Sequence, residues 1–292
     1  MKQLTVFTPT FNRKNNLIEC YESLKNQTSK DFVWQIVDDG STDDTLAIVD
    51  EFKKENLVEI EYFHKENGGK ASALNYGLSR VNTPFWVCLD SDDFLFPDAV
   101  EVMIKESNSV KADSNLCGIF CVRSDRSGKP MKAIDVPKNI VYATQEEIRY
   151  KYKVPPEYVQ VYKSSVISKI RFPEIDGEKF MVLSWMQDQL DTEYKFKVIH
   201  HPLMVCEYLA DGITKNYYKL MRKNPIGFRM FYAQRVHISK LLKVRFLAAL
   251  MYNAVYDLSE KREPKREKSL LITITRIPGI IYRRKIIRRG KE

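Results

Sequence analysis

The sequence predicts an α/β protein with a mostly parallel central sheet and helices on both faces. Two observations support this fold class: short apolar runs alternate with stretches whose apolar residues recur at helical spacing, and a polar loop follows each apolar run. Strands that alternate with helices of about ten to fifteen residues are typical of such sheets. Their ligands lie beyond the carboxyl ends of the strands, so we expect the polar loops to gather there.

The first part of the chain repeats this strand and loop pattern four times. The expected strands are residues 3–9, 32–37, 58–63 and 85–89. Apolar residues follow the first three strands at the spacing of a buried helix face. They are Leu17, Ile18, Tyr21 and Leu24, then Leu46, Val49 and Phe52, then Ala71, Leu74 and Leu78. The fourth strand leads into an acidic loop, and a further helix is expected to start near Pro97.

The acidic loop holds three carboxylates in four residues, Asp90, Asp92 and Asp93. Like charges this close repel one another and lose hydration beside a buried strand, so a cation is expected among them. Oxygen ligands favour a hard ion, Mg²⁺ or Mn²⁺. We predict that Asp92 and Asp93 bind the metal, whereas Asp90 could instead serve the ribose or the fold. The alternative is a solvated turn that caps the next helix.

The two preceding loops suit a nucleotide. Asp39 or its neighbour Asp38 can accept hydrogen bonds from a base edge or a ribose hydroxyl, and the other is expected to cap the following helix. Gly40 allows a tight turn beneath a ligand. The loop 67–70 ends in Lys70, a positive charge near the start of a helix and therefore favourable for phosphate. Each loop alone could be an ordinary turn, so the prediction depends on their ordered recurrence.

The strings Thr8–Arg13, Asp38–Asp43, Asn67–Lys70 and Asp90–Asp93 occur in this order, with Asn75 and Gly77 after the third. Together they resemble the family 2 glycosyltransferases of GT-A fold, of the bacterial surface-polysaccharide type. The resemblance implies transfer of a sugar from a nucleotide diphosphate, commonly UDP, with inversion and with a divalent metal on the diphosphate. The residues it implies around the nucleotide sugar are Thr8, Pro9, Phe11, Arg13, Asp39, Asn67, Lys70, Asp90, Asp92, Thr214 and Lys215. No G-x-G-x-x-G dinucleotide fingerprint follows the first strand.

The resemblance also implies a carboxylate general base in the second half of the domain. Residues 171–180 resemble the family stretch that ends in Gly-Glu-Asp, with Glu178 on the expected acid and Lys179 in place of the Asp. Apolar residues at helical spacing follow, so we expect Glu178 at or near a helix N-terminus, where the helix dipole favours the ionised form. Asp188 is the fallback, and an ordinary first-turn Glu is the alternative.

A later polar segment, 207–216, follows the expected strand 203–206. It resembles the family segment that closes over the diphosphate, but it carries Asp211 and Thr214 and no His. We therefore do not expect it to bind the metal directly. Lys215 could cover the phosphates or be an ordinary solvated lysine.

Composition gives the expected size and compartment. A chain of 292 residues with 44% hydrophobic content can bury a full α/β core and an appendage. The five cysteines fall mostly in expected strands and helices, and they predict reduced core residues rather than a zinc site. His200 and His201 are expected to make structural hydrogen bonds. Without a signal sequence or an apolar run of about 20 residues, we expect a cytoplasmic protein with no spanning helix.

The positive charge is concentrated at the C-terminal end. Residues 261–292 hold 12 Lys or Arg and 3 Glu, a net of +9, so residues 1–260 are neutral with 35 basic and 35 acidic residues. Aliphatic runs at 270–274 and 277–282 separate the cations. We predict that 269–292 contacts an anionic membrane. A docked helix is the alternative, and nucleic acid is disfavoured because no nucleic-acid fold motif accompanies the tail.

The sequence therefore predicts three parts: a catalytic domain 1–224, helices 225–260 that pack on it, and a basic membrane-associating tail 261–292. The expected activity is metal-dependent transfer from a UDP-sugar to a glycan or lipid-linked acceptor, in surface polysaccharide or glycolipid synthesis at the inner face of the cell membrane. One competing hypothesis is a nucleotidyltransferase, whose usual Gly-rich loop is absent from residues 8–13. The other is a non-catalytic scaffold that binds nucleotide and membrane.

Overall fold

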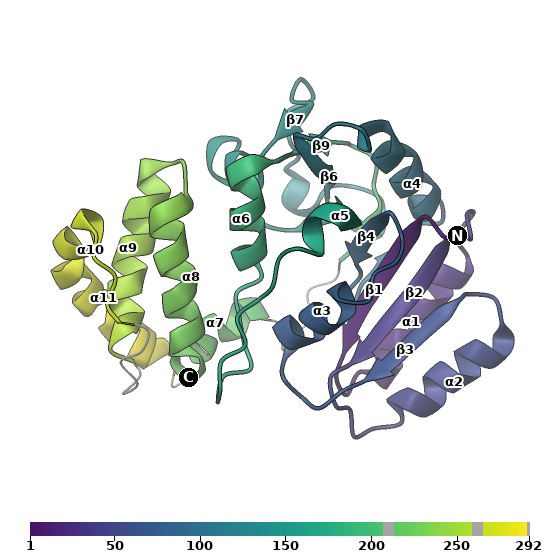
Figure 1. Cartoon of the computed structure of the whole chain (residues 1–292), viewed down its shortest axis with the longest axis horizontal. Helices are drawn as coiled ribbons and strands as arrows, with labels where there is room; N and C mark the ends of the chain where they lie inside the picture. Colours follow the sequence, from purple (N-terminus) through teal and green to yellow (C-terminus); the bar gives the residue numbers. More distant parts are fainter. Residues whose placement is uncertain (207–212, 259–264, 291–292) are drawn as a thin grey trace. The chain divides into compact units, whose positions relative to one another are not determined.

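The structure, a computed structural model, describes residues 1–206, 213–258 and 265–290, with the backbone alone at 213–215. It divides into two compact units (Figure 1). Unit 1 holds Met1–Arg171 and Glu193–Glu207, and unit 2 holds Phe172–Thr192 and Tyr208–Glu292. This division differs from the predicted domain limits because the segment before residue 192 belongs with the C-terminal helices.

The described residues of unit 1 form a mixed sheet of eight strands. Its order is β3 (Ile60–His64), β2 (Phe32–Asp38), β1 (Leu4–Thr10), β4 (Phe85–Cys88), β8 (Tyr158–Lys163), β6 (Leu116–Val122), β9 (Lys195–Val198) and β7 (Tyr142–Ala143). The first four strands run parallel, whereas β8 and β7 run antiparallel to their neighbours. The four predicted strands are confirmed, each with its ends within two residues of the prediction.

Helices cover both faces of this sheet, as predicted. Strand side chains alternate between the faces. On β1, Leu4 and Val6 belong to one buried cluster with residues of α1 (Lys14–Lys25), α2 (Thr45–Glu55) and α4 (Ala99–Val110). Phe7 points to the other face, where a Cβ on Gly77 of α3 (Lys70–Leu78) would come 2.3 Å from its ring. The remaining elements of unit 1 are β5 (Phe94–Leu95), which pairs with β10 (Met204–Val205), and the short helices η1 (Met131–Ala133), η2 (Glu147–Lys151) and α5 (Ser164–Ile167).

Two residues predicted to be buried are exposed. Ile18 on α1 is 43% exposed and Leu46 on α2 is 52% exposed. Each lies one residue after a buried position, Leu17 or Thr45. One residue corresponds to about 100° around a helix, which turns these side chains off the buried face.

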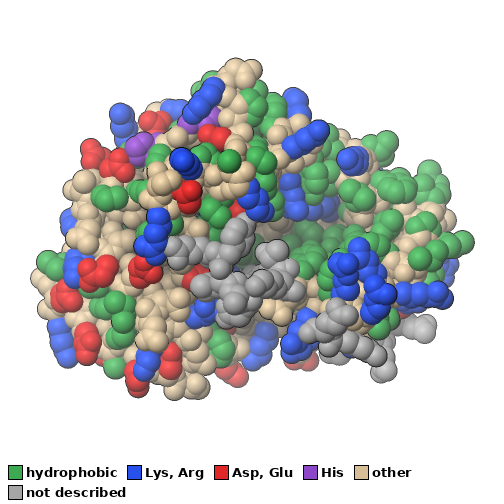
Figure 2. Space-filling model, turned by 180° about the vertical axis from the view of Figure 1, so that it is seen from behind, with side chains coloured by type: hydrophobic (Ala, Val, Ile, Leu, Met, Phe, Trp, Pro, Cys, Tyr) green, Lys and Arg blue, Asp and Glu red, His purple; other side chains and the backbone are tan. Residues whose placement is uncertain are grey.

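Unit 2 is helical in its described part. It contains α6 (Ser184–Glu193), α7 (Ile213–Lys223), α8 (Pro225–Ile238), α9 (Leu242–Tyr256), α10 (Leu270–Ile274) and α11 (Arg276–Arg289). The C-terminal segment is thus helical and docked within its unit. Arg283 of α11 pairs with Asp257 at 2.7 Å, and Arg222 of α7 donates to the carbonyl of Gly290 at 2.8 Å. Hydrophobic and basic side chains gather over these helices in Figure 2.

No helix among the described residues has the length and the apolar composition that a membrane span requires.

Candidate active site

The polar loops after β1 and β2 are tied together at the carboxyl edge of the sheet. The Asn12 side-chain oxygen accepts the backbone N–H of Thr42 at 2.8 Å, and the Asn12 N–H donates to the Ser41 hydroxyl at 2.8 Å. The Asp39 N–H donates to the carbonyl of Thr10 at 2.9 Å. The loops therefore gather where the sequence predicts. In the sheet, β2 lies on one side of β1 and β4 lies on the other, so the strand order reverses at β1. Such a topological switch point is where sheets of this kind bind ligands.

Asp39 organises the loop after β3. Its carboxylate accepts the Lys65 ammonium at 2.8 Å and the N–H groups of Gly68 and Gly69 at 3.0 and 2.6 Å. Gly40 has φ +83°, and a Cβ there would come 2.9 Å from the nitrogen of Asn67. Lys65 was not predicted as a site residue. The Asp39 carboxylate is thus already engaged by the chain on both oxygens.

The predicted helix cap is wrong. Asp38 accepts the Ser41 N–H and the Tyr62 hydroxyl, both at 2.7 Å. The helix α2 begins only at Thr45, six residues beyond Asp39, which is too far for Asp38 or Asp39 to cap it. Asp43 instead accepts the N–H of Thr45 at 3.2 Å and its hydroxyl at 2.5 Å.

The three acidic residues after β4 form one cluster with two cations. Ligand oxygens of Asp90, Asp92 and Asp93 lie within 4.8 Å of one another. Lys70 pairs with Asp90 at 2.5 Å. Arg123 pairs with Asp93 at 2.5 Å and reaches Asp90 at 3.7 Å. The cluster is therefore partly neutralised by the protein itself.

The balance between burial and these cations shifts the pKa values of Asp90 and Asp93 in opposite directions. Burial raises the pKa of Asp93 to about 7, against the opposing charge of Arg123. Burial also acts on Asp90, but the charges of Lys70 and Arg123 outweigh it and lower the pKa of that carboxyl to about 2. Asp90 is thus the firmly ionised member of the pair.

Arg123 was missed by the sequence analysis, although a signal for it exists. It directly follows the buried strand β6, as the acidic loop follows β4. Both strands run antiparallel to β8, so they run the same way and end at the same edge. A charged residue immediately after an apolar run could have been assigned to this edge if the strand order had been known.

Asp92 is the open carboxylate of the cluster. Across the residues that the structure describes, no N–H or O–H donates to its oxygens and no cation is paired with it. An all-oxygen donor set of this size fits a hard divalent ion. The fit is best at Asp92, because Asp90 and Asp93 already have cationic partners.

The residues predicted to hold the nucleoside differ in accessibility. Thr8 is fully buried, and its hydroxyl accepts the indole N–H of Trp34 at 2.9 Å, so its side chain belongs to the core. Phe11, just after β1, is 46% exposed. Pro9 and Arg13 are half-buried at the same strand end. Asn67 donates its amide to the carbonyl of Asp39 at 2.8 Å, so it too helps to hold the loop.

Glu178 lies in unit 2 and binds the start of a helix other than the predicted one. Its two carboxylate oxygens accept the N–H groups of Ile226 and Gly227, each at 2.8 Å, at the beginning of α8. In return, the Asn224 side-chain oxygen accepts two N–H groups, from Lys179 and Phe180, each at 3.1 Å. The helix that follows in sequence, α6, begins six residues after Glu178. The predicted placement at that N-terminus is therefore wrong.

Among the other residues predicted in this region, Asp188 has a protein partner, whereas the side chains of the rest are not described. The Asp188 carboxylate forms a bidentate salt bridge with the Arg235 guanidinium, with both hydrogen bonds at 2.7 Å. Asp211 lies outside the described residues. Thr214 and Lys215 fall in α7, where the structure gives the backbone alone.

The predicted structural roles of the histidines and cysteines agree with the geometry. His200 pairs with Asp135 and His201 with Asp98, each at 2.9 Å. No disulfide joins any of the five cysteines, all of which lie in the described residues, and Cys20, Cys117 and Cys121 are buried.

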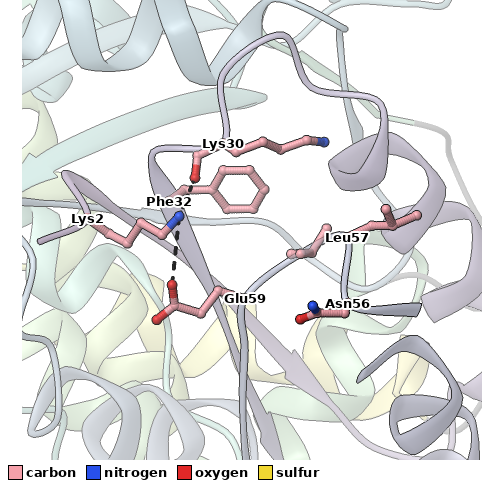
Figure 3. Close-up of a pocket in the computed structure, with 7 residues that line it drawn as sticks. Lys2, Lys30, Phe32, Asn56, Leu57 and Glu59 are labelled. Carbon is pink, nitrogen blue, oxygen red and sulfur yellow. Dashed lines mark hydrogen bonds and ion pairs between the residues drawn. The ribbon is translucent and has the colours of Figure 1, made fainter. Parts of the chain in front are cut away.

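A pocket in unit 1 lies at the opposite edge of the sheet (Figure 3). Its lining residues precede β1, β2 and β3 or begin β2, so it opens at the amino ends of the parallel strands. Within it, Lys2 pairs with Glu59 at 3.7 Å and donates to the Lys30 carbonyl at 2.6 Å. This pocket is separate from the loops that carry the acidic cluster.

Comparisons with known proteins agree with this geometry. The chondroitin synthase of Pasteurella multocida is 39% identical over 103 residues, which is 35% of this chain and 11% of that protein. Staphylococcus aureus TarS 1-349 in complex with UDP-GlcNAc has a TM-score of 0.61 at 17% identity, covering 97% of this chain and 81% of that one. The mannosyltransferase PcManGT from Pyrobaculum calidifontis, in complex with GDP-Man and Mn²⁺, has a TM-score of 0.58 at 17% identity, covering 99% and 86%.

These structural matches confirm the predicted GT-A type of α/β fold. The chain spans less than a fifth of the length of the curated relatives it matches. The family model described as Glycosyl transferase family 2 matches residues 5–170, more than half of the 292 residues. This chain therefore belongs to glycosyl transferase family 2.

Proposed function

We propose that the chain transfers a sugar from a nucleotide diphosphate, with UDP as the preferred nucleotide, to a glycan or lipid-linked acceptor. The observation that carries the proposal is the acidic cluster at the switch point of the sheet, where Asp90, Asp92 and Asp93 meet Lys70 and Arg123. When all three carboxylates are ionised, two cations leave a net charge of −1. Such a site suits a divalent ion that arrives together with a diphosphate.

A divalent ion, Mn²⁺ or Mg²⁺, would offset the negative charge that develops on the departing diphosphate. Asp92 and Asp93 would hold it, with Asp92 as the first ligand because no described residue bonds to its oxygens. Lys70 begins α3, where its charge and the helix N-terminus both favour phosphate. Phe11 offers an exposed ring just after β1 for the base, and Arg13 follows two positions later in the same loop.

Glu178 is our candidate for the general base that takes the proton of the acceptor hydroxyl. Two N–H groups at the start of α8 favour its ionised form. The resulting attack proceeds from the face opposite the diphosphate and inverts the anomeric carbon.

The names of similar proteins support the classes of donor and product. A relative is a chondroitin synthase, and another that matches is a teichoic acid poly(glycerol phosphate) polymerase of Staphylococcus epidermidis. We therefore place the reaction in surface polysaccharide or glycolipid synthesis. We further propose a peripheral site of action at the inner face of the cell membrane, where a lipid-linked acceptor would be accessible.

The proposal is tested by incubating the protein with a panel of nucleotide sugars, with and without Mn²⁺, and identifying the nucleotide that is released. We expect UDP from a UDP-sugar, only with the metal, and a product of inverted configuration by NMR. Release of a sugar 1-phosphate, with the nucleoside monophosphate carried to an acceptor, would indicate nucleotidyl transfer instead. No turnover with any donor, together with tight nucleotide binding, would favour a scaffold.

A further inference from the structure

The C-terminal helices α10 and α11 dock within unit 2 through their small and inward-facing residues. Ile272, Thr275, Gly279 and Ile286 are buried along one stripe. The Asn253 amide of α9 donates to the carbonyl of Ile272 at 2.7 Å and to the hydroxyl of Thr275 at 3.1 Å. A Cβ on Gly279 would come 2.4 Å from the Cβ of Asn253, so glycine permits this close contact.

The bulky aliphatic residues of the same helices face outward. They are separated by four, three and four positions, which is the spacing of one helix face. This outer stripe consists of Leu270, Ile274, Ile277 and Ile281, with exposed fractions of 56% to 77%. Its next two positions are the exposed cations Arg284 and Arg288. A docked helix normally buries its aliphatic face, so an apolar outer stripe indicates a partner that covers it.

The charge around the outer stripe has one sign. Residues 265–290 contain nine Lys or Arg and one Glu, a net of +8. Several of these cations are exposed beside the stripe, among them Arg276, Lys285 and Arg289. Figure 2 shows basic side chains next to the hydrophobic ones over these helices. The partner should therefore offer an apolar interior beneath a negatively charged surface.

We propose that the outer stripe is a preformed docking surface for a bilayer that contains anionic phospholipid. The aliphatic side chains enter the acyl boundary, and the long stems of Arg and Lys let their charges stay at the phosphates. The inference rests on the membrane contact in the proposed function, and it identifies the outer stripe as the surface that makes this contact. Because the opposite stripe stays packed on α9, binding requires no unfolding of the C-terminal helices.

A second copy of the chain fits this surface less well. Two copies that met through the same stripe would bring their clusters of cations together, and like charges across an interface oppose association. Anionic lipid instead complements both the charge and the apolar side chains.

The test is flotation of the full chain with two kinds of vesicle, phosphatidylcholine alone and phosphatidylcholine mixed with phosphatidylglycerol. The variant Ile277→Asp/Ile281→Asp removes two aliphatic side chains from the stripe. We expect its partition onto anionic vesicles to fall about tenfold or more, because at each position the bilayer no longer buries most of an isoleucine side chain. Leu46→Asp is the matched control. It changes a 52% exposed aliphatic residue of unit 1, and its partition should equal that of the parent.

A second variant keeps the aliphatic residues and separates charge from burial. Arg284→Gln/Arg288→Gln should weaken binding at low salt by about fivefold per cation and should differ little from the parent at high salt. Circular dichroism and nucleotide binding should be unchanged in every variant.

The outcomes separate the two proposals. If the parent floats with anionic vesicles and the double isoleucine variant floats equally well, the membrane contact stands and the outer stripe is not its face. If the parent binds neither vesicle, both the contact and the stripe proposal are wrong, whereas glycosyl transfer is judged by its own assay. A concentration-dependent dimer that the isoleucine variant abolishes, without lipid binding, would assign the stripe to a second copy.

Discussion

At the scale of single residues, the site is organised by carboxylates with different partners. Asp39 is held by Lys65 and two backbone N–H groups, and Asp93 is held by Arg123, whereas Asp92 has no hydrogen-bond or ion-pair partner among the described residues. A carboxylate that already has protein donors is costly to detach. Asp92 is therefore the acid best placed to bind a ligand reversibly.

The first prediction concerns Glu178→Gln. If Glu178 is the base, transfer should fall by about 10²–10⁴, with donor affinity unchanged, because glutamine cannot take the proton. The same substitution should cost about 1 kcal/mol or less of stability, since glutamine retains one acceptor for the start of α8. Single-turnover rates, calorimetry and thermal unfolding measure the three effects.

Glu174→Gln, at an exposed position four residues earlier, is the control and should leave turnover intact. A Glu178→Gln protein that loses stability but keeps its turnover would make Glu178 a helix cap alone. Asp188→Asn would then be the next variant, although the contact of Asp188 with Arg235 favours a structural role.

The second prediction concerns Arg123→Met. It removes the cation beside the buried Asp93, and breaking such a pair should cost about 3 kcal/mol in the free energy of unfolding. Arg126→Met is the matched control, because its pair with Glu19 is exposed and should contribute about 1 kcal/mol or less. Denaturant unfolding of the metal-free protein measures both.

Adding Asp93→Asn to the Arg123 variant should restore part of the lost stability, since no buried charge is then left unpaired. Equal effects of the two arginine substitutions would mean that the buried pair contributes no more than a surface contact.

At the scale of elements, the site is formed by loops that interlock through tight turns. The loop after β2 passes so close to the loop after β3 that only a glycine fits at position 40. Gly40 also has φ +83°, a conformation that side chains other than glycine rarely adopt. The position of the Asn67–Lys70 loop therefore depends on a residue that has no side chain.

The third prediction is that Gly40→Ala weakens nucleotide binding as well as stability. The backbone conformation alone costs about 1–2 kcal/mol, and the new Cβ must displace the nitrogen of Asn67. Gly128→Ala is the control, because Gly128 has φ +81° but an added Cβ would make only ordinary contact with Pro202. We expect similar strain in both variants and a loss of nucleotide affinity in Gly40→Ala alone. Equal affinities would show that the two loops adjust independently.

Sequence patterns predicted the elements of the fold better than their partners. Apolar runs located β1 to β4 because each strand contains apolar residues and a polar loop follows it, even though β3 is only partly buried. Apolar periodicity could not distinguish Leu17 from Ile18, since both are apolar neighbours and packing alone decides which one is buried.

Local sequence patterns could not predict which residues far apart in the sequence pair with one another. Arg123 meets Asp93 only because β8 reverses direction between β4 and β6. Glu178 binds α8 across 48 positions of sequence. The position of Arg123 directly after an apolar strand is a local signal, but it does not identify Asp93 as the partner, and both contacts depend on the order of elements in space.

At the scale of the whole molecule, charge is divided between a neutral body and a basic C-terminal end. The 35 basic and 35 acidic residues of 1–260 leave that part of the chain without net charge. The residues 265–290 form packed helices whose outward face is aliphatic and basic. The chain thus combines a family 2 sheet domain with the helical surface that we propose as the docking site for anionic lipid.

The central claim, a metal-dependent nucleotide site at the end of β4, is tested most directly by calorimetric titration of UDP with and without Mn²⁺. We expect the parent protein to bind UDP at least about tenfold more tightly with the metal, and Asp92→Asn to lose this difference, because the open carboxylate loses its charge. Asp98→Asn, which removes an acid paired with His201 outside the cluster, should keep it. Equal metal enhancement of UDP binding in the parent and in Asp92→Asn would contradict the assignment.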